Sequence, residues 1–302
     1  GRKSDPALGS GSARPRLSAS HAANTRGASS PVPGLATQVE QYSVVIAVGG
    51  IPVRLNTTDS DFLDLLHTRY AGFVSTGEGT EYEFDVQLGP LAFADRHADV
   101  SVKYRAGRWF LERGDFRAEW EPAAGRGIIR QAANPYAIDS VLRIVHTLVL
   151  AKQGGFLLHS ASAIRNGKAF LFAGVSGAGK TTISRLAPPD ATLLTDEISY
   201  VRKQPDGYVA YGTPFTGELA KLGENASAPV ATLYLLAQGP ENRIDPVATA
   251  DAGRELLANM LFFAEDPEMV HRAFQAACDF VGHIPVHRLT FVPDARVWEL
   301  IG

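Results

Sequence analysis

The sequence of 302 residues is 45% hydrophobic and 20% charged, which is typical of a globular chain of one or two domains with a sizeable core. Its net charge of −3 gives no basic surplus, and the sequence holds no motif for binding nucleic acid. No apolar run reaches the roughly 18 residues of a membrane-spanning helix, and the single Cys278 excludes an internal disulfide. We therefore expect a cytoplasmic protein that binds neither nucleic acid nor a membrane, with Cys278 as a small core residue.

The first 36 residues differ from the rest in composition. They are rich in Gly, Ser, Pro and Ala and contain almost no large apolar side chains. Such a segment cannot bury enough apolar surface to fold, so residues 1–36 are predicted to be a disordered, low-complexity tail.

Residues 37–132 are predicted to form a β-rich accessory domain. An Asp-Ser-Asp cluster at 59–61 indicates the start of a helix that continues to Tyr70. Short strands are predicted at 42–48, 82–86, 100–104, 108–112 and 116–120. Their alternating pattern favours a mostly antiparallel α+β region with one exposed face. The pattern leaves open whether this region recognises a substrate or partner, or only covers the rest of the chain.

Residues 133–302 are predicted to form a second domain of α/β class. It begins with a helix over 134–153, capped by Asn134, with Pro135 in its first turn and two glycines after its end. Further strands are predicted at 157–162, 169–173, 191–195, 199–203, 208–211, 232–236 and 286–292, and further helices at 182–187, 254–263, 267–282 and 295–301.

Residues 174–181 form a complete G-x-x-x-x-G-K-[ST] phosphate loop between a predicted strand and a predicted helix. Its glycines allow backbone N–H groups to curl around phosphates, and a helix N-terminus favours negative charge. Lys180 can reach the β- and γ-phosphates, and the Thr181 hydroxyl can bind Mg²⁺. The residues expected to bind the nucleotide are Gly174, Ser176, Gly177, Ala178, Gly179, Lys180, Thr181 and Thr182.

The apolar run at 191–195 ends in an acidic pair, Asp196 and Glu197. Acidic residues at the end of a buried strand are typical holders of Mg²⁺ in nucleotide-binding folds. Asp196 follows Lys180 by only 16 residues (196 − 180), which leaves room for one short helix, one turn and one strand. This spacing is shorter than an ATPase motor needs.

Together these features resemble the HPr kinase/phosphorylase and phosphoenolpyruvate carboxykinase superfamily. Three segments carry the resemblance, which covers about residues 134–220: the loop at 174–182, the acidic segment at 193–197, and a strand at 157–162 that contains His159. The second acid is usually Asp in the family and is Glu197 here. The chain also lacks the oxaloacetate-binding segments of the carboxykinases and the C-terminal signature of true HPr kinases.

The resemblance implies a P-loop kinase core of this type. It implies an ATP- and Mg²⁺-dependent kinase that transfers the γ-phosphate to a hydroxyl, that of a serine in a small protein or peptide. A kinase for a small hydroxyl compound, or a nucleotide-binding regulator without transfer activity, are the alternatives. The family also includes homo-oligomers, but no assembly surface can be identified from the sequence.

The resemblance also implies roles for individual residues. Asp196 would accept the proton of the acceptor hydroxyl, with Glu197 nearer the metal, although the two could exchange roles. His159 is expected at the end of the neighbouring strand, where it would hydrogen-bond Asp196 and tune its pKa. The predicted catalytic residues are therefore Asp196, His159 and Lys180, and the predicted metal ligands are Thr181, Glu197 and Asp196.

The segment 212–218 and Arg254 are also candidate parts of a site. Residues 212–218 have the Gly, Pro and Thr content of a site loop, and the family often has a Gly-x-Pro element here. Arg254 could clamp a phosphate, but we expect it to be a solvated helix residue.

Overall fold

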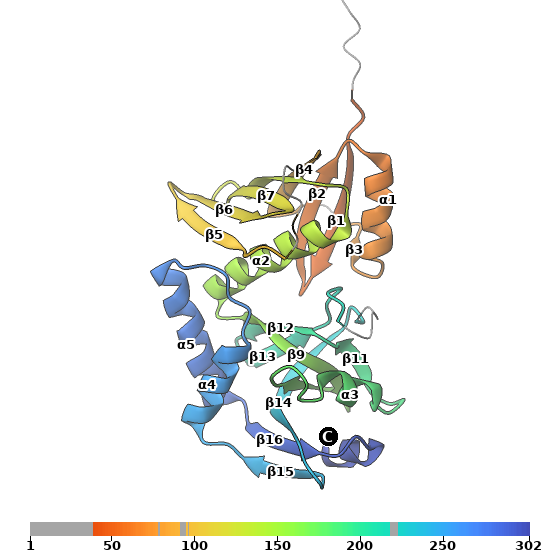
Figure 1. Ribbon diagram of the computed structural model, residues 1–302, viewed down its shortest axis with the longest axis vertical. Helices are drawn as coiled ribbons and strands as arrows, with labels where there is room; N and C mark the ends of the chain where they lie inside the picture. Colours follow the sequence, from red (N-terminus) through yellow and green to blue (C-terminus); the bar gives the residue numbers. More distant parts are fainter. Residues whose placement is uncertain (1–38, 78, 91–94, 96, 218–222) are drawn as a thin grey trace, which may run out of the picture. The chain divides into compact units, whose positions relative to one another are not determined.

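The computed structural model describes residues 39–77, 79–90, 95, 97–217 and 223–302. The chain divides into two units, residues 1–38 and 39–302, and all the described elements belong to the second. The predicted disordered tail, residues 1–36, lies outside the described residues. Figure 1 shows the helices and strands of the second unit, whose described residues form two eight-stranded sheets.

The first sheet has the strand order β3-β1-β2-β4-β8-β7-β6-β5. Its strands are β1 (Tyr42–Val48), β2 (Ile51–Thr57), β3 (Val74–Ser75), β4 (Tyr82–Leu88), β5 (Ser101–Arg105), β6 (Arg108–Arg113), β7 (Phe116–Glu121) and β8 (Arg126–Gln131). The five predicted strands are confirmed, whereas β2, β3 and β8 were not predicted. Most neighbours pair antiparallel as expected, but β4 pairs in parallel with both β2 and β8.

Two helices pack with this sheet. α1 (Ser60–Arg69) begins as predicted, because the Asp59 carboxylate accepts a hydrogen bond from the backbone N–H of Phe62. α2 (Pro135–Gln153) is capped by the Asn134 side chain and ends at Gly154, which has a φ of 76°. α2 is buried on most of its surface, because it shares one hydrophobic cluster with the first sheet, α1 and β12. This helix therefore joins the core of residues 39–131 to the second sheet.

The second sheet has the order β10-β9-β12-β13-β14-β16-β15, with β11 also paired to β9. Its strands are β9 (Phe156–Arg165), β10 (Lys168–Ala173), β11 (Thr192–Thr195), β12 (Ile198–Gln204), β13 (Gly207–Tyr211), β14 (Ser227–Gln238), β15 (Arg243–Pro246) and β16 (Val286–Phe291). β14 runs parallel to β10 and β16, and the other pairs are antiparallel. Among these strands only β15 was not predicted.

Apolar side chains cover both faces of this sheet. On one face, Leu171 and Leu235 belong to a cluster with α4 (Thr249–Asn259) and α5 (Pro267–His283), which lie side by side in Figure 1. On the other face, Phe172 and Leu236 pack with α3 (Lys180–Arg185) and a final 3₁₀-helix, Ala295–Leu300. The fold is thus of mixed α/β type with large sheets. None of the described helices has the length and apolar character needed to cross a membrane.

Two sequence predictions about the helices are wrong. The helix expected at 254–263 begins earlier and ends at Asn259, because Met260 leaves the helix to form a β-bridge with Leu158 of β9. Cys278 is exposed rather than in the core. α5 buries Ala276, Ala277 and Phe280, and the next position after Ala277 faces outward.

Candidate functional site

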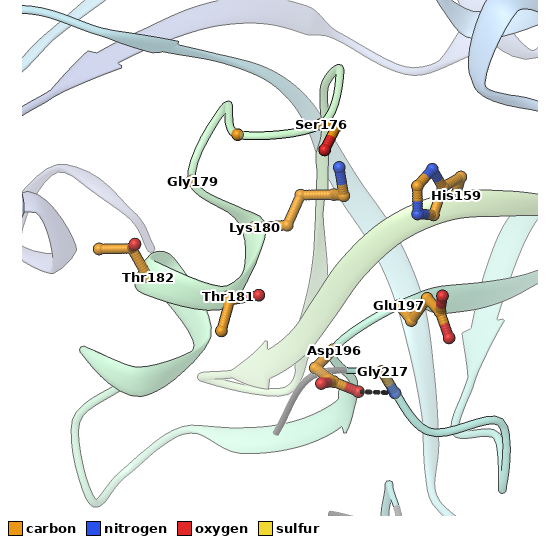
Figure 2. A pocket seen from close by; sticks show the side chains of 10 residues that line it. His159, Ser176, Gly179, Lys180, Thr181, Thr182, Asp196, Glu197 and Gly217 are labelled. Atoms are coloured by element: carbon orange, nitrogen blue, oxygen red, sulfur yellow. Dashed lines mark hydrogen bonds between the residues drawn. The ribbon is translucent and has the colours of Figure 1, made fainter. Parts of the chain in front are cut away.

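A cavity of about 240 Å³ lies beside the loop that joins β10 to α3, as Figure 2 shows. Its lining residues come from β9, from this loop and α3, from the turn after β11, and from the segment after β13. They are His159, Ser176, Gly177, Gly179, Lys180, Thr181, Thr182, Asp196, Glu197 and Gly217. The structure therefore brings into one pocket the sequence segments that carry the predicted catalytic and metal-binding residues.

Two of the residues expected to bind a nucleotide do not line this cavity. Ala178 is buried and packs in the core below the loop. Gly174 begins the loop, and a Cβ added there would lie 2.7 Å from the Cβ of Ala178. Both residues therefore influence the shape of the loop by packing on its buried side. Any contact that they make with a ligand would come from the backbone.

The shape of the loop depends on two glycines and one side chain outside it. Gly177 and Gly179 have φ angles of 81° and 112°, which residues with a side chain rarely adopt. A Cβ on Gly179 would also lie 2.6 Å from Cζ of Phe291. The Gln238 side chain, at the end of β14, donates a hydrogen bond of 2.6 Å to the carbonyl of Gly177. Gln238 belongs to no sequence motif, so its position at the end of a strand was the only signal that could have identified it as a site residue.

The Lys180 ammonium is directed into the loop. It donates hydrogen bonds to the carbonyl oxygens of Gly174 (2.7 Å) and Val175 (3.3 Å). In Figure 2 it lies beside Ser176, with Thr181 following at the start of α3. Lys180 therefore places a positive charge at the loop, where an anionic group would be drawn.

The acidic pair lies in the turn between β11 and β12. The Thr195 hydroxyl accepts hydrogen bonds from the backbone N–H groups of Glu197 (3.2 Å) and Ile198 (3.1 Å), which fixes the course of this turn. Asp196 is buried, and its Oδ1 accepts a hydrogen bond of 3.0 Å from the N–H of Gly217. The predicted site loop at 212–218 thus reaches the pocket at Gly217, whereas Glu218 lies outside the described residues.

Glu197 has a partner that the sequence analysis missed. Its carboxylate lies 3.6 Å from the guanidinium of Arg143 on α2, which in turn stacks over the ring of Phe215. Burial raises the pKa of Glu197 and nearby Asp196 adds to this, while the charge of Arg143 opposes the increase. A basic residue among the apolar residues in the middle of this helix was the available signal for Arg143.

His159 lines the pocket. It was expected at the end of its strand, but it lies within the strand. It is the fourth residue of β9, which continues to Arg165 because it pairs with β10 and β11 beyond this point. Burial lowers the pKa of His159, and the charges of Lys180 and Arg143 lower it further. All three effects favour the neutral form of the imidazole. Its hydrogen bond to Asp196 stays a prediction.

The chemistry of the pocket suits a hard cation better than a transition metal. Within the described residues, no three or more His, Cys, Asp or Glu side chains gather as a metal cluster. The predicted ligands Thr181, Asp196 and Glu197 offer hydroxyl and carboxylate oxygens, and Mg²⁺ commonly binds one or two carboxylates together with substrate phosphates. These residues therefore fit Mg²⁺ bound together with a phosphate ligand.

Arg254 does not line the pocket. It is exposed on α4 and paired with Asp251, as expected of a solvated helix residue.

The fold and the site define a mixed α/β protein whose polar pocket combines a glycine-rich loop, a lysine, a histidine and two carboxylates. The chain belongs to the family described as SynChlorMet cassette protein ScmC, whose model matches residues 131–302. This match spans more than half of the chain and includes every residue that lines the pocket, and β1 to β7 precede it. A search of curated proteins gives no significant match.

Proposed function

We propose that the protein is an ATP- and Mg²⁺-dependent kinase with a P-loop core of HPr kinase type. It transfers the γ-phosphate to a hydroxyl, that of a serine in a small protein or peptide. The observation that carries the proposal is the pocket itself: Lys180, His159 and the pair Asp196–Glu197 come from separate segments and line one small polar cavity. Phosphoryl transfer needs this combination of positive charge and oriented carboxylates more than it needs covalent chemistry.

The loop side of the pocket would hold the nucleotide. Gly177 and Gly179 give the backbone a curvature that suits a bound phosphate chain, and the hydrogen bond from Gln238 preserves it. Lys180 would turn from the Gly174 and Val175 carbonyls to the phosphates. Thr181 with Asp196 or Glu197 would hold Mg²⁺, which supplies charge neutralisation at the phosphates when it is bound.

The acidic side would receive the acceptor. In the transfer, the acceptor oxygen bonds to the γ-phosphorus, the bond from that phosphorus to the ADP oxygen breaks, and the acceptor proton passes to a carboxylate. We assign this proton to Asp196, because the Gly217 N–H holds its carboxylate in a fixed orientation on the pocket wall. The neutral imidazole of His159, which burial and the nearby cations favour, would donate one hydrogen bond and accept another beside the reacting groups.

We also propose that the kinase acts in the cytoplasm, where ATP is abundant and a single exposed cysteine stays reduced. The chain has no surplus of basic residues that would favour nucleic acid as the acceptor.

The test is phosphate transfer from γ-labelled ATP with Mg²⁺, using serine-containing peptides and a pool of small hydroxyl metabolites in parallel. We expect label on a peptide, and loss of transfer of 10²-fold or more (order of magnitude) in Lys180→Met and Asp196→Asn. Lys168→Met, at the exposed end of β10, and Asp206→Asn, in an exposed turn, are matched controls that should retain activity.

Each other outcome has a defined meaning. Label on metabolites alone would replace the peptide acceptor with a small molecule. Tight ATP binding with no transfer to any acceptor would contradict the kinase proposal and favour a nucleotide-binding regulator. Transfer that persists in Asp196→Asn but disappears in Glu197→Gln would move the role of proton acceptor to Glu197.

A further inference from the structure

The segment from Thr213 to Gly217 makes a series of contacts that end at the pocket. The carbonyl of Pro214 accepts a hydrogen bond of 3.1 Å from Nη1 of Arg69, at the end of α1. The next residue, Phe215, is buried beneath the guanidinium of Arg143. Two residues later, the N–H of Gly217 holds Asp196. Arg69 therefore binds the chain at Pro214, three residues before the amide that orients the proposed proton acceptor.

Arg69 is itself held in place by a second group. Its Nη2 forms a mostly buried ion pair with Asp139 of α2, and the hydroxyl of Tyr70 donates to the same carboxylate. Tyr70 is fully buried. A planar guanidinium has N–H donors on both of its terminal nitrogens, so it can bind the carboxylate and the Pro214 carbonyl at once and in fixed directions. A lysine ammonium would hold these two acceptors in a less defined geometry.

The end of α1 also contacts the chain where it returns towards β14. The side-chain amide of Asn225 donates a hydrogen bond of 3.0 Å to the carbonyl of Gly72. Residues 69–72 thus bind the chain both before Gly217 and after residue 222. These residues precede the part of the chain that matches the family model, whereas Asp139, Pro214 and Gly217 lie within it. This arrangement gives residues 39–131 a direct connection to the acidic side of the pocket.

We propose that Arg69 is a positioning residue, which holds Pro214 so that the Gly217 amide stays on Asp196. Residues 39–131 are then part of the acceptor side of the site and not only a cover for it. The catalytic consequence rests on the proposed kinase function. Loss of Arg69 lowers kcat and raises the KM of the acceptor, and it leaves the affinity for ATP unchanged, because Arg69 binds Pro214 and Asp139 on the acceptor side of the pocket.

The test compares two variants that share the change at Asp139 and differ at Arg69. Asp139→Asn removes the ion pair but retains the Arg69 donor to Pro214. Arg69→Met combined with Asp139→Asn removes that donor without leaving a buried carboxylate unpaired. Hydrogen–deuterium exchange of residues 213–217, measured without any ligand, should be about fivefold faster in the double variant, as expected for the loss of one hydrogen bond. Far-UV circular dichroism and thermal unfolding verify that both variants are folded.

Kinetics complete the test. The double variant should lose kcat relative to Asp139→Asn, with the same Kd for ATP, and Arg69→Lys should recover part of the loss. Equal exchange rates in the two variants would overturn the proposal, as would a change in ATP affinity without a change in kcat. If the wild-type protein transfers no phosphate, the kinase proposal fails, and the exchange measurement still decides whether Arg69 positions this segment. Arg117→Met, in an exposed ion pair of β7, is the control from the same region.

Discussion

The backbone N–H of Gly217 donates a hydrogen bond to Oδ1 of Asp196, with 3.0 Å between the two atoms. The position of a buried carboxylate in the pocket therefore depends on a residue of a different loop. Gly217 is also closely packed: a Cβ added there would lie 2.9 Å from Cβ of Glu197 and 3.0 Å from Oδ2 of Asp196. Any side chain at 217 must displace one of the two acidic residues.

Gly217→Ala is the first prediction from this contact. The added methyl should move Asp196 or separate it from the 217 amide, so we expect a loss of phosphate transfer of about tenfold or more, which corresponds to about 1.4 kcal/mol. The measurement is the steady-state rate with a saturating concentration of ATP. Gly89→Ala is the control, since a Cβ there meets no atom within 4 Å. Full activity in Gly217→Ala would show that the contact does not support catalysis.

A second prediction concerns the phosphate loop. Gln238→Ala removes the hydrogen bond of 2.6 Å to the Gly177 carbonyl, so the loop should sample more conformations before it binds a ligand. We expect the Kd for Mg-ATP to increase about fivefold, the effect of about 1 kcal/mol, with little change in unfolding temperature. Isothermal titration calorimetry gives the affinity directly. Gln87→Ala, at an exposed position of β4, provides the matched control and should leave the Kd unchanged.

Local patterns were sufficient to predict much of the fold. The strand, loop and helix around Lys180 follow from an apolar run, a glycine-rich motif and its flanking residues, all within about 20 positions of the chain. The caps Asp59 and Asn134 could be recognised for the same reason. β8, by contrast, has only Ile128 and Ile129 as large apolar residues, so its sequence alone does not indicate a strand. Pairing with β4 and β7 stabilises it.

The residues that the sequence analysis missed act over long distances in the chain. Arg69 and Pro214 are 145 positions apart, and Gln238 and Gly177 are 61 apart. Pro214 lies in the predicted site loop, but Arg69 belongs to no motif, so only the folded chain could reveal the contact between them. Arg143 was overlooked because the apolar stripe of α2 explained the helix without it. His159 was selected by family resemblance, and its strand is longer than expected because of its pairing with β10.

A third prediction follows from the charges near His159. Its pKa is lowered by burial first, then by Lys180 and then by Arg143. Removing either cation should therefore raise the pKa of His159 toward its ordinary value, with Lys180→Met having the larger effect. Nuclear magnetic resonance titration of the imidazole protons measures this directly and does not depend on any activity. Lys168→Met should leave the titration as in the wild type, and an unchanged titration in both Lys180→Met and Arg143→Met would contradict the geometry.

The last prediction concerns the stability of the fold. His146 is buried in α2, its Nδ1 lies 2.8 Å from the hydroxyl of Tyr200, and burial lowers its pKa from 6.5 to about 4. In the unfolded chain the imidazole has its ordinary pKa, so between pH 6.5 and 4 the unfolded state binds more protons than the folded state. The free energy of unfolding therefore rises with pH across this range, and acidification removes stability.

The size of this effect can be measured with one variant. The shift corresponds to about 3 kcal/mol between pH 7 and pH 4 for a single group. His146→Gln keeps a polar side chain near Tyr200 but cannot titrate, so its urea-unfolding free energy should fall less on acidification than that of the wild type, by about this amount. His271→Gln, on the exposed side of α5, should retain the wild-type slope. If His146→Gln shows the same pH dependence as the wild type, the imidazole of His146 is not the group that links folding to protonation in this range.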